Sequence, residues 1–187
     1  MKRLMLNRVL AALALCAAVA LPAQATIVDF EDVAPTLFSG SSESSGGFSF
    51  ASSGAGFSGI DEAGAFLFGV APPNSSGQFL FGLNGDVLTM TQSGGGSFRL
   101  LGLDASFLPP LPDLGAGLQA GQLHIEALTV GGLITADFDF GLSDANGAWS
   151  FASFATDAMA SGVTAVSFSA CVYDFWRGGF GCFRDDF

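Results

Sequence analysis

The stretch Ala136-Asp137-Phe138-Asp139-Phe140 alternates apolar and charged residues with a period of two. Successive side chains of a β-strand point to opposite faces of a sheet, so this spacing places both Phe rings on one face and both carboxylates on the other. The same spacing of phenylalanine recurs in three further places: Phe48 and Phe50, Phe66 and Phe68, and Phe79 and Phe81. The pattern predicts strands with a buried aromatic face and a solvated polar face.

Clusters of Gly, Ser, Asn and Pro separate these runs, which is typical of a sandwich or barrel of short antiparallel strands. We expect hairpin turns at Asn84-Gly85 and Gly131-Gly132, because both central residues of a type I′ turn need a positive φ. The strands predicted from these patterns are Thr26–Val33, Gly47–Phe50, Ala65–Val70, Gln78–Leu83, Asp86–Gln92, Ser97–Phe107, Gln122–Val130, Leu133–Leu142, Trp149–Phe154, Val163–Val172 and Phe180–Phe187.

The first 25 residues have the features of a secretory signal peptide. A basic start is followed by an apolar run from Val9 to Leu21 and by Ala23-Gln24-Ala25, the small-x-small pattern of a cleavage site. The apolar run is short for a membrane span. We therefore expect a single domain, residues 26–187, that has no membrane span and folds outside the cytoplasm, in the periplasm or the extracellular space.

The expected mature chain is strongly acidic. It keeps Arg99, Arg177 and Arg184 against 17 Asp and Glu residues, a net charge of −14. Nucleic-acid backbones and anionic lipid headgroups repel such a chain, so neither is an expected partner. Neutral glycans, cations such as calcium and other proteins are compatible with this charge. The alternative is that acidity only keeps a Phe-rich exported protein in solution.

Two cysteines, Cys171 and Cys182, lie outside the signal, and an even count in an oxidising compartment favours a disulfide. A hairpin that turns at Arg177-Gly178-Gly179 would place Cys171 opposite Cys182 and Tyr173 opposite Phe180. Residues opposite each other on paired strands are within disulfide reach. Closing so short a loop stabilises a fold by about 2–3 kcal/mol.

Carboxylates gather at both ends of the expected domain. Asp29, Glu31 and Asp32 lie on its first predicted strand, and Asp185 and Asp186 lie on its last. If these two strands are adjacent, their oxygen ligands converge in an arrangement suited to calcium. The alternative is a solvated acidic edge that discourages aggregation between sheets.

No residue pattern predicts a catalytic site. Gly54–Gly59 fits the spelling G-x-G-x-x-G, but no helical segment follows it, so we interpret the match as chance. His124 is the single histidine, and the chain has no G-x-S-x-G nucleophile motif to serve it. Its place between Leu123 and Ile125 predicts the outer face of a strand. A zinc site is not expected, because no second histidine is present.

Short segments of the chain resemble exported bacterial proteins of the PEP-CTERM/exosortase-associated type. The segments that carry the resemblance are Val28–Val33, Ser97–Asp104, Leu128–Gly132, Val163–Phe168 and Phe183–Phe187. The resemblance implies a jelly-roll β-sandwich, similar to galactose-binding-like modules, with first and last strands adjacent. It implies a structural calcium ion at Glu31 and Asp186, with Asp29 and Asp185 as neighbours. The sorting tail of that family (Pro-Glu-Pro, an apolar span and a basic end) is not found before Phe187, so sorting by that route is not expected.

Three hypotheses about function follow from the sequence. The first is a secreted non-enzymatic protein of the cell envelope or matrix that binds exopolysaccharide. The second is a secreted hydrolase that acts on polysaccharide through carboxylates such as Asp137 and Asp139. The third is a structural subunit stabilised by calcium that has no other ligand.

Overall fold

The computed structural model describes residues 25–64, 72, 77–108, 117, 121–156, 159, 162–174 and 179–182, with side chains described as far as Cys171. The elements assigned in these residues are all strands, and all of their pairings are antiparallel. They are β1 (Thr36–Leu37), β2 (Ser42–Ser45), β3 (Phe48–Ser52), β4 (Phe57–Glu62), β5 (Gln78–Leu83), β6 (Leu88–Gln92), β7 (Gly102–Ala105), β8 (Gly121–Thr129), β9 (Gly132–Asp139), β10 (Ala152–Ala155), β11 (Val163–Asp174) and β12 (Gly179–Cys182).

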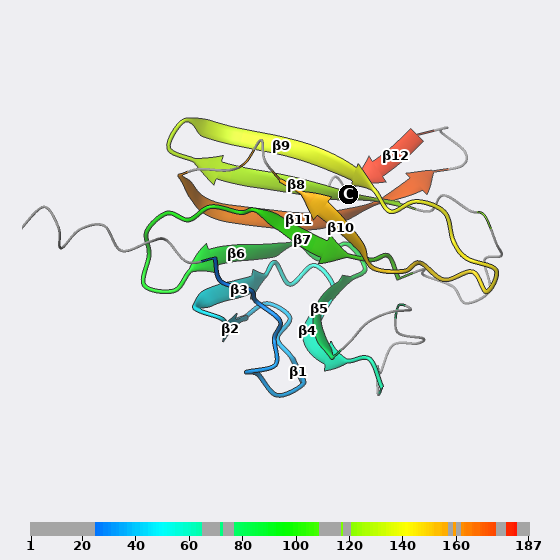
Figure 1. Ribbon diagram of the computed structural model, residues 1–187, viewed down its shortest axis with the longest axis horizontal. Coiled ribbons are helices and arrows are strands. Elements are labelled where there is room, and N and C mark those ends of the chain that lie inside the picture. The colour runs from blue at the N-terminus through cyan, green and yellow to red at the C-terminus, as the bar shows by residue number, and fades with distance from the viewer. Residues whose placement is uncertain are drawn as a thin grey trace, which may run out of the picture.

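Seven strands form a large sheet in the order β2-β3-β6-β11-β8-β9, with β12 paired to β11 as well (Figure 1). The longest strand, β11, has 12 residues and is paired on both edges. On one edge β8 follows it from Val163 to Val172. On the other edge, Val166–Phe168 pairs with β6 and Cys171–Asp174 pairs with β12. Two short strands therefore share one edge of β11.

Two smaller sheets pack against the large one: β1-β4-β5 and the pair β10-β7. In Figure 1 the β7 and β10 strands cross in front of the large sheet, and β4 and β5 lie below it. The ring centroids of Phe138 on β9 and Phe154 on β10 are 5.2 Å apart. Since the large sheet ends at β2 and β9, it does not close into a barrel. The fold is all-β and sandwich-like, as the alternation of the sequence predicted.

The hydrophobic core lies between these layers. The large sheet contributes Phe50, Met90, Ile125 and Val166, all buried, with Ile125 and Val166 fully so. Trp149 belongs to the same core cluster at 1% exposure, and its ring centroid lies 5.3 Å from that of Phe107 in an edge-to-face contact. One face of β3, β6, β8 and β11 therefore supplies much of the core among the described residues.

Most predicted strands are confirmed within a few residues, and Gln78–Leu83 coincides with β5. The alternation at residues 136–140 is also confirmed, because Phe138 and Phe140 face the core while Asp137 and Asp139 are exposed. Of the predicted strand Ser97–Phe107 only β7 is a strand, preceded by a single bridge between Phe98 and Val163. The predicted strand 65–70, with its Phe pair, lies outside the described residues.

The prediction of a strand at Thr26–Val33 is wrong. The chain makes a turn there, with Phe30 at φ 63° and the amide of Val33 donating to the carbonyl of Phe30 at 3.2 Å. Asp29 and Asp32 accept hydrogen bonds from nearby groups, and such local bonds compete with a strand ladder. Among the described strands, the first, β1, pairs with β4 and the last, β12, pairs with β11; most of the predicted last strand, residues 183–187, lies outside the described residues.

Both predicted hairpin turns need correction. Asn84 and Gly85 have φ of 58° and 80°, as a type I′ turn requires, yet β5 and β6 belong to different sheets. This turn is therefore a corner that carries the chain from one sheet to the other. Between β8 and β9, Thr129 pairs with Gly132, so the loop consists of residues 130 and 131.

The sequence patterns did not predict three of the observed strands: β1, β2 and β4. β2 and β4 lie in segments rich in Ser and Gly, where alternation is weak, and β1 has only two residues. In addition, no helix among the described residues is long and apolar enough to span a membrane.

We expect Ile125→Ala to lower the free energy of unfolding by about 2–5 kcal/mol, because it opens a cavity in the middle of the large sheet's buried face. The matched control is Val130→Ala in the β8–β9 loop, which removes an apolar side chain that is 89% exposed. The control should change stability by less than about 0.5 kcal/mol. Urea unfolding monitored by tryptophan fluorescence measures both, and equal effects would contradict this description of the core.

Candidate functional site

The solvent-facing side of the large sheet carries hydrogen-bonding side chains in transverse rows. We call this surface the polar face and define it by nine residues of β6, β8, β9 and β11: Thr89, Gln122, His124, Glu126, Thr135, Asp137, Asp139, Ser167 and Ser169. One row runs across all four strands, through Thr89, Ser167, Glu126 and Thr135. These residues alternate with core residues, which is why they share one face.

Neighbouring side chains of the polar face hydrogen-bond to one another. Thr89 and Ser167 hydroxyl oxygens lie 3.0 Å apart, and Gln122 Nε2 donates to Asp139 Oδ1 at 2.7 Å. These hydrogen bonds restrict the rotamers of the side chains that make them. The surface therefore offers an ordered set of hydroxyl, amide and carboxylate groups.

His124 lies at the centre of the densest part of this network. Its Nδ1 is 2.6 Å from Asp137 Oδ1, directly opposite on β9, and its Nε2 is 3.4 Å from Glu126 Oε1 on its own strand. The predicted position of His124 on the outer face of a strand is confirmed. Its two carboxylate neighbours were not foreseen, because they depend on strand register.

The predicted register of the C-terminal hairpin is confirmed: Cys171 lies opposite Cys182, and Tyr173 lies opposite Phe180. Cys171 is disulfide-bonded and fully buried. The register favours Cys182 as its partner, as the sequence predicts. Cys171 is on the same side of β11 as Ser167 and Ser169, so its sulfur borders the polar face rather than the core.

The most heavily hydrogen-bonded carboxylate in the described residues belongs to Asp86, at the corner between β5 and β6. It is only 5% exposed and accepts five hydrogen bonds. The donors are the hydroxyls of Ser52, Ser53 and Ser58 and the amides of Gly54 and Val87. Asp86 therefore joins the β3–β4 connection, including the Gly54–Gly59 segment, to the corner. Asp86 thus has a structural role. Its hydrogen bonds account for the conformation of the Gly54–Gly59 segment without a bound nucleotide.

Burial raises the pKa of the Asp86 carboxyl, but hydrogen bonds from Ser52, Ser53, Ser58 and Gly54 together outweigh burial and lower the pKa below its usual value. The ionised form is thus favoured in the folded protein.

The acidic residues of the N-terminal turn each bind a protein group. Asp32 Oδ1 accepts from the Ser45 hydroxyl at 2.5 Å, and Glu31 Oε1 accepts from the Gln78 amide at 2.8 Å. Asp29 Oδ1 accepts from the Glu31 amide at 3.2 Å. The bonds from Ser45 and then from the Gly46 amide lower the pKa of Asp32. Asp32 therefore connects the turn to β2 and Glu31 connects it to β5, whereas the bond of Asp29 lies within the turn.

The predicted calcium site is only partly within the described residues, since Asp185 and Asp186 lie outside them. Within the described chain, Asp29, Glu31 and Asp32 do not form a group whose ligand atoms lie together. Among the residues that the structure describes, one group of His, Cys, Asp and Glu does so: His124, Asp137 and Cys171, with all three ligand atoms within 4.8 Å of one another.

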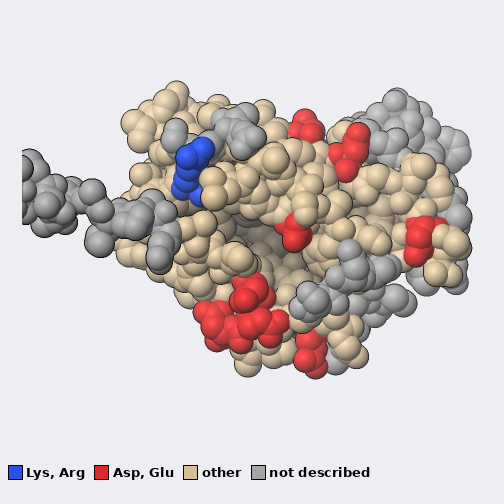
Figure 2. Space-filling view, in the orientation of Figure 1, with Lys and Arg blue, Asp and Glu red and all other residues tan. Residues whose placement is uncertain are grey.

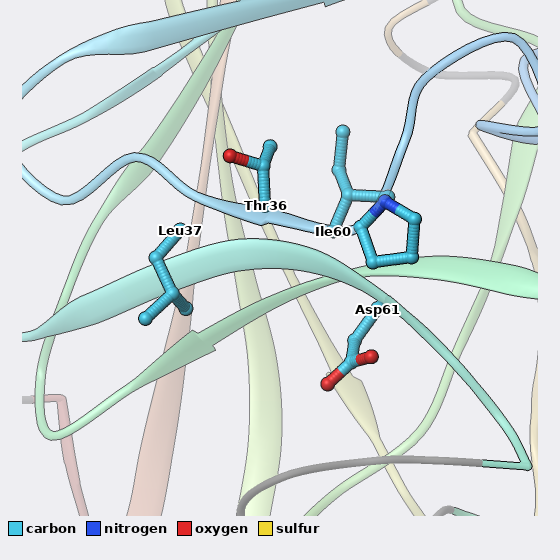
Figure 3. Close-up of a pocket in the computed structure, with 5 residues that line it drawn as sticks. Thr36, Leu37, Ile60 and Asp61 are labelled. Carbon is cyan, nitrogen blue, oxygen red and sulfur yellow. The ribbon is translucent and has the colours of Figure 1, made fainter.

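A small pocket of about 180 Å³ lies at the β1–β4 edge, lined by Pro35, Thr36, Leu37, Ile60 and Asp61 (Figure 3). Thr36 and Ile60 extend to one side of the strand pair, whereas Leu37 and Asp61 extend to the other. The polar groups of this pocket therefore do not converge on one point.

Acidic side chains predominate on the described surface. Figure 2 shows acidic side chains at several places on the visible face and a single basic patch. Arg99 is the only Lys or Arg among the described residues. No protein-family model, curated protein or solved structure matches the chain.

We expect acid to destabilise the protein through Asp86. Because the pKa of Asp86 is lowered by folding, its contribution is fully present above the unfolded value of about 3.9 and is lost as the pH falls through the lower folded value. Asp86→Ala should lower the free energy of unfolding by more than about 2 kcal/mol at neutral pH, since it leaves buried donors without an acceptor. The variant should also lose less stability than the unchanged protein as the pH falls.

Unfolding curves measured between neutral pH and pH 2 test this expectation, with Asp104→Ala as the matched control. Asp104 is exposed and accepts one hydrogen bond, from the Ser153 hydroxyl. If Asp86→Ala retains the pH dependence of the unchanged protein, Asp86 does not have the role assigned to it.

Proposed function

We propose that the protein is an exported, non-enzymatic binding protein of the bacterial cell envelope or extracellular matrix, and that its polar face binds a neutral exopolysaccharide. The signal peptide at residues 1–25 and a jelly-roll-like connection of the strands are parts of this proposal. The observation that carries it is the set of ordered hydrogen-bonding rows on the polar face.

The spacing of these rows suits a polymer of hydroxyl groups. Neighbouring strands are about 4.8 Å apart, and alternate residues along one strand about 6.8 Å apart. Side chains on such a lattice can donate to and accept from sugar hydroxyls on successive units of an extended chain. Carboxylates such as Asp137 and Asp139 form the stronger, charge-assisted bonds.

Charge selects among polysaccharides. The surface is acidic, with Glu126, Asp137 and Asp139 on the polar face itself, so polyanionic chains are repelled. None of the nine polar-face residues is Phe, Tyr or Trp, so we do not expect sugar rings to stack on large aromatic side chains there. Affinity must come from many hydrogen bonds of about 1 kcal/mol each, which favours long polymers over single sugars.

Retention of the protein by a panel of immobilised neutral and acidic polysaccharides tests this proposal. We expect retention by at least one neutral polymer, and weakening of about tenfold in a Gln122→Ala/Thr135→Ala variant that removes two hydrogen-bonding groups. Ser153→Ala on β10 is the matched control, because it removes a hydroxyl from the other layer. No retention by any polymer would reject sugar binding.

Degradation of a polymer in the same panel would instead favour the hydrolase hypothesis. In that case Asp137→Asn or Asp139→Asn should abolish turnover without weakening retention to the same extent.

We also propose structural calcium as a second, separable feature, with Asp29 and Glu31 contributing oxygens together with Asp185 and Asp186. Calcium bound between the N-terminal turn and the C-terminal end stabilises the folded state, so the thermal midpoint should rise with added calcium and fall with chelator. An Asp185→Asn/Asp186→Asn variant should lose this response. A midpoint that does not change with calcium would reject the site and leave the carboxylates of the turn as hydrogen-bond acceptors only.

A further inference from the structure

Three potential metal ligands meet at one border of the polar face: His124 on β8, Asp137 on β9 and Cys171 on β11. Their ligand atoms, a ring nitrogen, a carboxylate oxygen and a sulfur, all lie within 4.8 Å of one another. His124 and Asp137 are direct partners in the strand register, and Cys171 pairs with the residue two positions before His124. Adjacent strands of one sheet therefore fix all three positions.

This donor set suits a borderline-soft divalent cation. Zinc binds nitrogen and oxygen at about 2.0–2.2 Å and sulfur at about 2.3 Å, so tetrahedral ligand atoms are separated by roughly 3.3–3.6 Å. The ligand atoms now lie within 4.8 Å of one another, with Nδ1 and Asp137 Oδ1 2.6 Å apart, so metal binding requires small side-chain rotations that adjust these distances. Three protein ligands leave a fourth position for water, as in open zinc sites.

The surroundings of His124 support the same assignment. A metal-bound histidine usually donates its other ring N–H to a carboxylate, which fixes the tautomer. Glu126 Oε1 lies 3.4 Å from Nε2, whereas Nδ1 faces Asp137. Without metal, the 2.6 Å contact requires Nδ1–H to donate to Asp137; metal binding at Nδ1 moves the ring proton to Nε2, where Glu126 accepts it. Glu126 is then a positioning residue for the site.

The sulfur of Cys171 is not free to act as a thiolate, because it is disulfide-bonded. A thiolate is the form that binds zinc, and a disulfide sulfur is a poor ligand. We propose that reduction of the Cys171 disulfide creates a divalent-metal site made of Cys171, His124 and Asp137, and that disulfide and metal exclude each other.

The reaction balances with a phosphine as the reductant. The phosphine gives two electrons to the disulfide and becomes a phosphine oxide, while water supplies its oxygen and the protons of two thiols. Metal binding then displaces the proton of the Cys171 thiol to solvent and forms one metal–sulfur bond. The group of three ligands is accessible to solvent on the side of Asp137, whose side chain is 54% exposed, whereas the side chain of His124 is 16% exposed.

Cobalt(II) and zinc(II) titrations of the full chain test the proposal, with cobalt as the spectroscopic probe. We expect the phosphine-reduced protein to bind cobalt with sulfur-to-cobalt charge-transfer absorption, and excess zinc to remove that absorption. The oxidised protein should show no such band. Cys182→Ser, which frees Cys171 if Cys182 is its partner, should bind cobalt without any reductant.

Variants of the polar face define the ligands. His124→Ala and Asp137→Asn should each weaken zinc binding to the reduced protein by more than about tenfold, and Glu126→Gln should weaken it by about tenfold as an outer partner. Asp139→Asn is the matched control, because it removes an equal charge two residues from Asp137 and should leave binding unchanged. Near-ultraviolet circular dichroism of the buried Trp149 confirms that each sample is folded.

Equal binding by the oxidised and reduced proteins would overturn the proposal, as would sulfur-to-cobalt absorption that survives in both His124→Ala and Asp137→Asn. If Cys182→Ser does not fold, the reduced unchanged protein still decides the question. If reduction itself unfolds the protein and zinc does not restore the fold, the site does not exist.

Discussion

The structure depends on one constraint: every central strand of the large sheet has two unlike faces. Ile125 and Val166 are fully buried on one side, while His124 and Ser167, one residue away, are on the other. A shift of register by one residue would expose the core and bury the polar groups. The same alternation that makes the core therefore assembles the polar face, so stability and the candidate binding surface have a common origin.

The sequence was sufficient to predict much of this arrangement, and the residues show why. The alternation at residues 136–140 and the Cys171–Cys182 register depend on local periodicity and on a short hairpin, both of which are visible in the chain. The strand β4 was missed because Ser58, Gly59 and Asp61 are all buried in it, which hides any alternation between polar and apolar faces.

The candidate sites were harder to predict, since they depend on pairing between distant strands. His124 and Asp137 are 13 residues apart, and Cys171 is further along, so only the strand register brings them together. Nothing in the sequence around Asp86 predicts that its carboxylate accepts hydrogen bonds from three serine hydroxyls of residues 52–58. The carboxylates of the N-terminal turn also accept hydrogen bonds from protein groups, which composition alone does not identify, and the calcium site expected there stays a prediction.

The position of β11 along the chain sets the order in which the molecule can fold. This strand joins β6 to β8, yet it is the last but one of the described strands. Until residues 163–174 are available, β3–β6 and β8–β9 remain two unconnected ribbons with exposed edges. If the chain is exported from its amino end, as proposed, its large sheet can be completed only after residues 163–174 have emerged, and folding would be delayed until then.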